Sequence, residues 1–140
     1  MVFELNPKVE ELFEDAKELY EEALRDLEAG RIRKAAENAW CATVRATEAL
    51  LVSRGRDYEV VRWPEPRRVE LDRLAIEDEE VRRLYIPERY GSRETYLHGS
   101  CFYEGIYEPK STIRRIKETI DYIRDAMRLS GLTKQASDLV

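Results

Sequence analysis

Five alanines between residues 32 and 54 limit the folds open to this chain more than any other feature of its sequence. They recur at alternating spacings of four and three, the spacing of one face of an α-helix: Ala35, Ala39, Ala42, Ala46 and Ala49. A face of alanines is smooth and lets a neighbouring helix approach closely. The pattern therefore predicts a helix from about Ile32 to Arg54, ended by Gly55 and packed tightly against other helices.

Two further long helices are predicted by their end signals and apolar spacing. Asn6-Pro7 is typical of a helix start, because Asn caps the first turn and Pro fits the first helical position. Apolar residues then follow with helical period as far as Gly30. The last helix is expected to run from Pro109 to Gly131, with an apolar stripe along it: Ile113, Ile116, Ile120, Ile123 and Met127.

The middle of the chain is less regular. Residues 58–63 have a β-like composition but stop at a proline, so we interpret them as an extended connection. The apolar residues between 71 and 85 predict one or two short helices. A helix is also expected from Ser92, as its cap, to about Tyr103.

These segments predict an all-α fold, an up-and-down antiparallel bundle of four to five helices. Trp40 and the isoleucine stripe are expected to share its core. At 140 residues the chain is long enough for one domain, so we expect residues 1–140 to form it, with 132–140 as a frayed tail.

Charge and composition bound the function. The chain is 38% charged with few Asn and Gln residues, which is typical of proteins from thermophiles. Its first 30 residues hold ten acidic and three basic side chains, leaving +2 for the remainder of the net charge of −5. This balance argues against strong, indiscriminate nucleic-acid binding. No apolar run approaches the ~18 residues that span a bilayer, and the N-terminus lacks a signal-peptide pattern, so we expect a cytoplasmic protein without membrane contact.

Neither metal nor nucleophilic cysteine chemistry is indicated. Cys41 and Cys101 stand sixty positions apart without a CxxC motif, and we interpret them as two partly buried free thiols. One histidine and scattered glutamates give no metal-ligand spacing, so no metal and no cofactor is predicted.

His98, the only histidine, stands five residues after Arg93. Histidine is the one side chain whose unperturbed pKa lies near neutrality, and the planar arginine fork fits a phosphate. With Ser92 as a cap, Arg93 would lie in the first turn of a helix, where free N–H groups favour an anion. At roughly 100° per residue the two side chains would point about 140° apart. Either the pair acts on a phosphate, or His98 packs structurally at the edge of the core.

Aromatic side chains crowd the same segment, residues 90–107. In one interpretation these side chains pack at the edge of the core, and in the other they stack on nucleic-acid bases. They are Tyr90, Tyr96, Phe102, Tyr103 and Tyr107.

Two segments carry a family resemblance. Residues 30–55, GRIRKAAENAWCATVRATEALLVSRG, resemble the second helix of the HEPN superfamily (higher eukaryote and prokaryote nucleotide-binding domains). Residues 92–105, SRETYLHGSCFYEG, stand where that superfamily carries its Arg-x4–6-His motif, and their LH and FYE pieces resemble its small stand-alone archaeal PaREP-type branch. The resemblance covers roughly residues 7–130, apart from 56–92.

The resemblance implies an HEPN-like bundle of four or five helices that forms a two-fold homodimer. Many members are metal-independent endoribonucleases, often toxins beside a nucleotidyltransferase antitoxin. By carry-over, Arg93 would hold the scissile phosphate, and His98 would move a proton as the RNA 2′-hydroxyl attacks and leaves a cyclic phosphate. The two motifs of a dimer would meet in one cleft.

Three more residues are predicted to bind substrate. Asn38 matches a polar position that some members place near the cleft, and Ser100 and Tyr103 follow His98 in the motif segment. Members paired with a nucleotidyltransferase typically carry Tyr where Ser100 stands, so this chain departs from that branch.

Three functions stay open at this level. The first is the ribonuclease. The second is a non-catalytic module that binds RNA or a nucleotide through the same residues. The third is a dimeric helical domain whose partner is a protein and in which His98 is structural.

Overall fold

The structure, a computed structural model, describes residues 6–132, and every regular element in that range is helical. The predicted all-α fold is confirmed for these residues. The elements are α1 (Pro7–Glu28), α2 (Ile32–Ser53), α3 (Tyr58–Val61), α4 (Pro64–Glu77), α5 (Glu79–Arg83), α6 (Ile86–Arg93), the π-helix η1 (Glu94–Glu104), α7 (Pro109–Lys117) and α8 (Thr119–Leu129).

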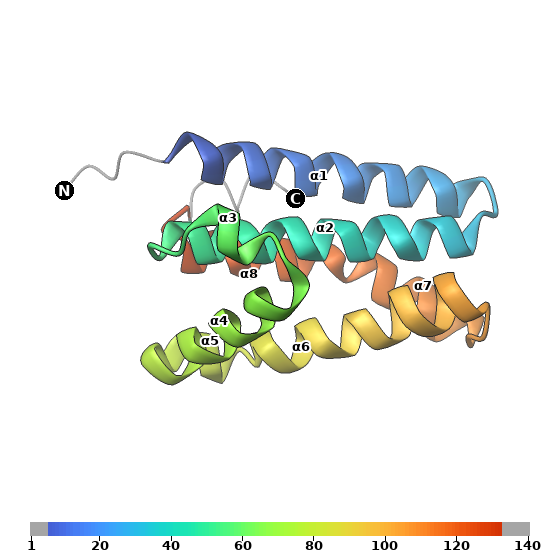
Figure 1. Ribbon diagram of the computed structural model, residues 1–140. Coiled ribbons are helices and arrows are strands. Elements are labelled where there is room, and N and C mark those ends of the chain that lie inside the picture. Colours follow the sequence, from blue (N-terminus) through green and yellow to red (C-terminus); the bar gives the residue numbers. More distant parts are fainter. Residues whose placement is uncertain (1–5, 133–140) are drawn as a thin grey trace.

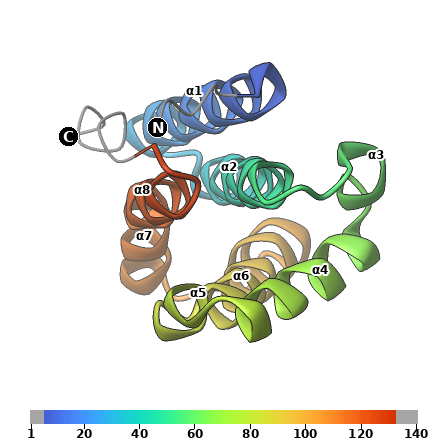
Figure 2. The same ribbon diagram turned by 90° about the vertical axis from the view of Figure 1, so that its left-hand side faces the viewer.

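The long elements run back and forth along one axis (Figure 1). α1 and α2 form an antiparallel pair, α6 continues into η1 beside α2, and α7 with α8 returns along the other side. The short helices α3 to α5 make an excursion between α2 and α6. Seen from the end, α2 lies between α1, α8 and α6, so its alanine-rich surface is covered from several sides (Figure 2).

The end signals and the alanine face behave as the sequence predicts. Asn6 Oδ1 accepts a hydrogen bond from the Lys8 N–H at 2.8 Å, which caps α1. The five alanines of the α2 stripe are all fully buried. Trp40, Ile116 and Ile123 lie in one hydrophobic core, as expected, whereas Ile113 and Ile120 of the same stripe are only half-buried.

The extended connection expected at residues 58–63 is wrong, because Tyr58–Val61 forms α3. The Asp57 side chain accepts a hydrogen bond from the Glu59 N–H at 2.9 Å and caps this turn. A side-chain cap therefore outweighs the β-branched composition. Only Trp63, after the turn, has an extended backbone, with φ −93° and ψ 140°.

The single C-terminal helix expected from Pro109 to Gly131 is also wrong, since Glu118 separates α7 from α8. The break falls where side chains enter the hydrogen-bond ladder. The Arg115 carbonyl accepts from Arg93 Nη2 at 3.1 Å and from the Thr119 hydroxyl at 3.4 Å. Insertion of such groups is a recognised cause of helix kinks.

Leu132 belongs to the core and not to a frayed tail. It is buried, and its N–H donates to the Met127 carbonyl at 2.8 Å across Gly131, whose φ is +85°. This is the closing pattern of a helix C-terminus. The rest of the expected tail, residues 133–140, lies outside the described residues.

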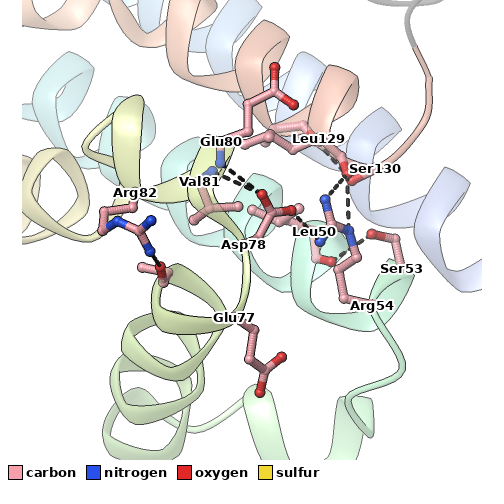
Figure 3. A network of polar contacts seen from close by, with 12 residues as sticks. Leu50, Ser53, Arg54, Glu77, Asp78, Glu80, Val81, Arg82, Leu129 and Ser130 are labelled. Atoms are coloured by element: carbon pink, nitrogen blue, oxygen red, sulfur yellow. Dashed lines mark hydrogen bonds and ion pairs between the residues drawn. The ribbon is translucent and has the colours of Figure 1, made fainter.

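The Arg54 side chain links the ends of α2 and α8 to the start of α5, and so holds the segment of short helices α3 to α5 against the bundle (Figure 3). It follows the last residue of α2, and its Nη2 donates to the Leu129 carbonyl at the end of α8 at 2.7 Å. Its Nη1 lies 2.7 Å from a carboxylate oxygen of Asp78, which in turn caps α5 through the Glu80 N–H. The segment before α6 is therefore held, through Asp78 at the start of α5, where α2 and α8 end.

A buried polar network fixes α4 and α6 against α2. Glu48 of α2, almost fully buried, pairs with Arg45 at 2.8 Å and with Arg67 of α4 at 3.5 Å. Arg67 Nε also donates to the Tyr90 hydroxyl of α6 at 3.0 Å. These contacts set the position of the helix that carries Arg93.

Candidate functional site

α6 passes into η1 without a break, so the helix start expected at Ser92 is wrong. Ser92 lies inside α6. Arg93 is the last residue of α6 and also has helical backbone angles, φ −67° and ψ −38°. The start lies earlier, after Tyr85, where Pro87 occupies an early helical position. Backbone N–H groups near Arg93 are therefore used inside the helix and offer no anion site.

The π-helix η1 changes the directions in which the side chains of Arg93 and His98 point relative to each other. Its hydrogen bonds join residues five apart and not four apart, so side chains along η1 are spaced differently around the axis than in an α-helix. Arg93 Nε donates to the Thr43 hydroxyl at 2.9 Å, and His98 pairs with Glu37 at 2.8 Å. Both partners belong to α2, but Arg93 also donates through Nη2 to the Arg115 carbonyl and the Thr119 hydroxyl, on the side of α7 and α8.

The end of η1 is closed by an arginine of α2. Arg33 donates to the Phe102 carbonyl through Nη2 at 2.7 Å and through Nε at 3.1 Å. Gly105 follows with φ +73°, and a Cβ atom there would lie 3.1 Å from Arg33 Cζ. Gly105 thus serves both the backbone turn and the close approach of Arg33.

His98 and Glu37 form a polar pair at the surface of the bundle. His98 Nδ1 lies 2.8 Å from Glu37 Oε1, and the His98 side chain is 42% exposed. Because a carboxylate only accepts hydrogen bonds, this contact assigns the proton of neutral His98 to Nδ1. Nε2 then carries the lone pair and has no hydrogen-bond partner among the described residues. The arrangement presents one proton acceptor, held in orientation by a carboxylate.

Aromatic rings confine the imidazole. The centroid of the Phe102 ring lies 6.2 Å from that of His98 at an interplanar angle of 23°, and Trp40 lies 6.2 Å away on α2. Trp40 in turn packs against Tyr90 at 5.1 Å. One aromatic ring from α2 and one from η1 therefore lie beside the imidazole.

Arg93 has different surroundings. Its side chain is buried, with the residue 7% exposed, and Nη2 donates to the Arg115 carbonyl and the Thr119 hydroxyl. No carboxylate of the described residues pairs with it. Burial lowers the pKa of the guanidinium to about 10, so it stays charged at neutral pH.

Arg93 lines an open pocket of about 410 Å³ between α6 and the α7–α8 junction. None of the residues that contact His98 lines this pocket. Within one chain, Arg93 lines this pocket and His98 does not. The predicted roles of Arg93 and His98 stay predictions.

The three residues predicted to bind substrate are dispersed. Asn38 donates to Asp26 of α1 at 2.8 Å, whereas His98 pairs with Glu37. Ser100 lines a hollow between η1 and the start of α7. Tyr103 lies in the last turn of η1 and is 76% exposed.

Glu37 is the residue that the sequence analysis missed. It is the only charged residue between Lys34 and Arg45, in the alanine-rich part of α2. A lone acidic residue in an otherwise apolar or neutral helical stretch needs a polar partner, and that signal could have identified it.

The two cysteines differ in their burial. Cys101 is fully buried and Cys41 half-buried, and burial raises the pKa of both thiols. Residues 6–132 contain no group of three His, Cys, Asp or Glu side chains placed to hold a metal ion. Nor does this range contain a helix both long and apolar enough to cross a membrane.

No family model, curated protein or solved structure matches the chain.

Proposed function

We propose that this protein is an HEPN-like, metal-independent endoribonuclease in which His98 transfers the proton. The observation that carries the proposal is the His98–Glu37 pair. It combines a half-exposed imidazole, an assigned tautomer with Nε2 open to a ligand, and two neighbouring aromatic rings. These are the attributes of a positioned general base.

The reaction needs no group from outside the protein and its RNA. Nε2 of His98 accepts the proton of a ribose 2′-hydroxyl, whose oxygen attacks the adjacent phosphorus. The bond from phosphorus to the 5′-oxygen breaks, a 2′,3′-cyclic phosphate forms, and the leaving oxygen takes a proton from water or from His98. Glu37 acts as a positioning residue, because its carboxylate orients the ring and stabilises the imidazolium that forms.

Arg93 is proposed to neutralise the phosphate in a homodimer. Its guanidinium lacks a carboxylate partner among the described residues, but it opens away from the contacts of His98 in its own chain. A shared phosphate therefore requires a composite cleft, as the HEPN resemblance implies. A nucleotidyltransferase partner remains part of the wider proposal, although Ser100 replaces the tyrosine typical of that branch.

An RNA cleavage assay in EDTA tests the proposal. Wild-type protein should leave 2′,3′-cyclic phosphate ends, and His98→Ala should lower the rate by about 100-fold or more. Light scattering at micromolar concentration should report a dimer. A folded wild-type protein that cleaves none of a varied RNA set, or a monomer with full activity, would contradict it.

The second candidate function is binding of RNA or a nucleotide without cleavage. The separate surroundings of Arg93 and His98 within one chain favour it. Retained RNA binding without cleavage, weakened by His98→Ala, would support this function instead.

A further inference from the structure

The pocket beside Arg93 has an unusual charge distribution. Its lining contains four arginines and three carboxylates, together with Ser92: Arg89, Arg93, Arg114, Arg115, Glu88, Glu118 and Asp121. Several of these charges are already engaged. Glu118 pairs with Arg114 at 3.0 Å, Asp121 with Arg124 at 3.6 Å, and Arg89 with Asp125, outside the lining, at 2.8 Å.

Two lining arginines have no ion-pair partner among the described residues. One is Arg93, which is over nine-tenths buried. Its Nε and Nη2 are engaged with neutral groups, and Nη1 donates no hydrogen bond within residues 6–132. A buried positive charge without a counter-ion is costly, which favours an anion at the open side of its guanidinium.

The other is Arg115. Its guanidinium carbon lies 4.0 Å from the centroid of the Tyr96 ring, and this cation–π contact restrains the side chain at the pocket. A restrained fork loses little conformational entropy when it binds a ligand. Glu88 opposes both arginines, since it lines the pocket and has no ion-pair partner among the described residues.

We propose that this pocket binds a phosphate group, between the guanidinium groups of Arg93 and Arg115 and the hydroxyl of Ser92. Planar donor forks match the oxygens of a tetrahedral oxyanion. The volume of about 410 Å³ admits a phosphate with an attached sugar. Free phosphate, a nucleotide and an RNA backbone share this chemistry. Arg93 is also the residue proposed to neutralise the phosphate of the RNA, so this inference rests in part on the proposed function. It adds Arg115 and Ser92 to that phosphate site, which lies apart from His98 within one chain.

Calorimetric titration of the full chain with inorganic phosphate tests the site. Arg115→Gln should weaken binding by about tenfold, the effect of losing one charge-assisted hydrogen bond. Glu88→Gln should strengthen binding, because it removes the opposing charge. The matched control is Arg62→Gln, which removes an arginine that also stacks on aromatic rings, at 5.8 Å from Tyr58 and 5.2 Å from Trp63, outside the pocket. It should leave the affinity unchanged.

Titrations with uridine 5′-monophosphate and with an unphosphorylated RNA oligonucleotide identify the source of the phosphate. Tighter binding of the nucleotide than of inorganic phosphate indicates a terminal phosphate with its sugar, and tighter binding of the oligonucleotide indicates the backbone. His98→Ala should bind inorganic phosphate as wild type does, so failure of this site and failure of the ribonuclease proposal are distinguishable. Absence of phosphate binding at millimolar concentration overturns the inference, as do equal affinities of wild type, Arg115→Gln and Glu88→Gln.

Discussion

His98 of η1 and Glu37 of α2 are joined by a contact of 2.8 Å across 61 positions of sequence. The contact fixes three properties at once: the side from which the ring is held, the nitrogen that carries the proton and the nitrogen left open. His98 lies within the π-helix, whose hydrogen bonds join residues five apart, so the direction of its ring depends on that helix type.

Glu37→Gln should lower the rate of RNA cleavage by about tenfold, with the loss in kcat and little change in KM. The amide keeps the size of the side chain but no longer stabilises an imidazolium. A purely structural role for Glu37 would not change the pH profile of the reaction, whereas loss of the carboxylate should change it. Cleavage rates measured between pH 5 and 8 compare wild type with the variant.

The control for this experiment is Glu14→Gln on the exposed side of α1, which removes the same charge far from His98. It should leave both the rate and the pH profile unchanged. If Glu37→Gln and Glu14→Gln behave alike, the carboxylate does not act on His98 during catalysis.

Asn38→Ala should lower the stability of the protein without changing its cleavage or binding of RNA. The Asn38 amide donates to Asp26, a buried carboxylate that also pairs with Arg31 at 3.1 Å. Loss of this hydrogen bond should lower the free energy of unfolding by about 1–3 kcal/mol. Urea unfolding measures this change, and cleavage or RNA binding should stay at the wild-type level. A variant with wild-type stability but impaired RNA binding would return Asn38 to the substrate site predicted from the sequence.

The contrast between Asn38 and Glu37 illustrates what the sequence could predict. The alanine period, Asn6-Pro7 and the closing glycines are local signals, and they gave α1, α2 and the all-α class. Which of two adjacent polar residues on α2 meets His98 depends on how α2 and η1 are rotated against each other, and π-helices are too rare for the sequence to indicate one here. An extended connection was predicted in place of α3, because the stabilising cap from Asp57 outweighs the β-like composition of residues 58–63.

The break in the C-terminal helix was missed for a different reason. It arises where Arg93 and Thr119 bind the Arg115 carbonyl, a tertiary contact between residues 22 positions apart. The apolar stripe continues across the break, so periodicity alone predicts one helix.

Gly105→Ala should lower the free energy of unfolding by about 1–2 kcal/mol, because the residue has φ +73° and a Cβ atom would crowd Arg33. Thermal unfolding measures the effect. Gly91→Ala is the matched control, since Gly91 lies within α6 and a Cβ atom there meets nothing within 4 Å. It should be neutral or stabilising by up to about 1 kcal/mol. Equal destabilisation by both substitutions would exclude the backbone explanation.

Thr43→Val should destabilise the protein by about 1–3 kcal/mol in urea unfolding, because it leaves Arg93 Nε buried without an acceptor. Valine keeps the shape of threonine, so the change isolates the hydroxyl. Thr112→Val is the control: the Thr112 hydroxyl only donates to the Glu108 carbonyl within one helix turn, at 2.8 Å. An effect of Thr43→Val no larger than that of Thr112→Val would contradict the role of Thr43 in holding Arg93.

Asp78 should make part of the stability dependent on pH. Burial by itself raises the pKa of this carboxyl, but hydrogen bonds from Arg54 and from the backbone of Glu80 and Val81 lower it below its ordinary value of 3.8. The folded state therefore favours the ionised form more than the unfolded chain does. This contribution is complete above the unfolded pKa and is lost as the pH falls through the lower folded pKa.

Asp78→Asn should accordingly lower the free energy of unfolding at pH 7 by about 1–2 kcal/mol, with a smaller difference from wild type as the solution is acidified below about pH 4. Asparagine caps a helix as well as aspartate does, so the change isolates the ion pair with Arg54. Asp57→Asn is the matched control, because Asp57 caps α3 without an ion-pair partner among the described residues. Urea unfolding at pH 7 and in acid measures both variants. A difference between wild type and Asp78→Asn that stays constant from pH 7 into acid would show that the charge of Asp78 does not hold the ends of α2, α5 and α8 together.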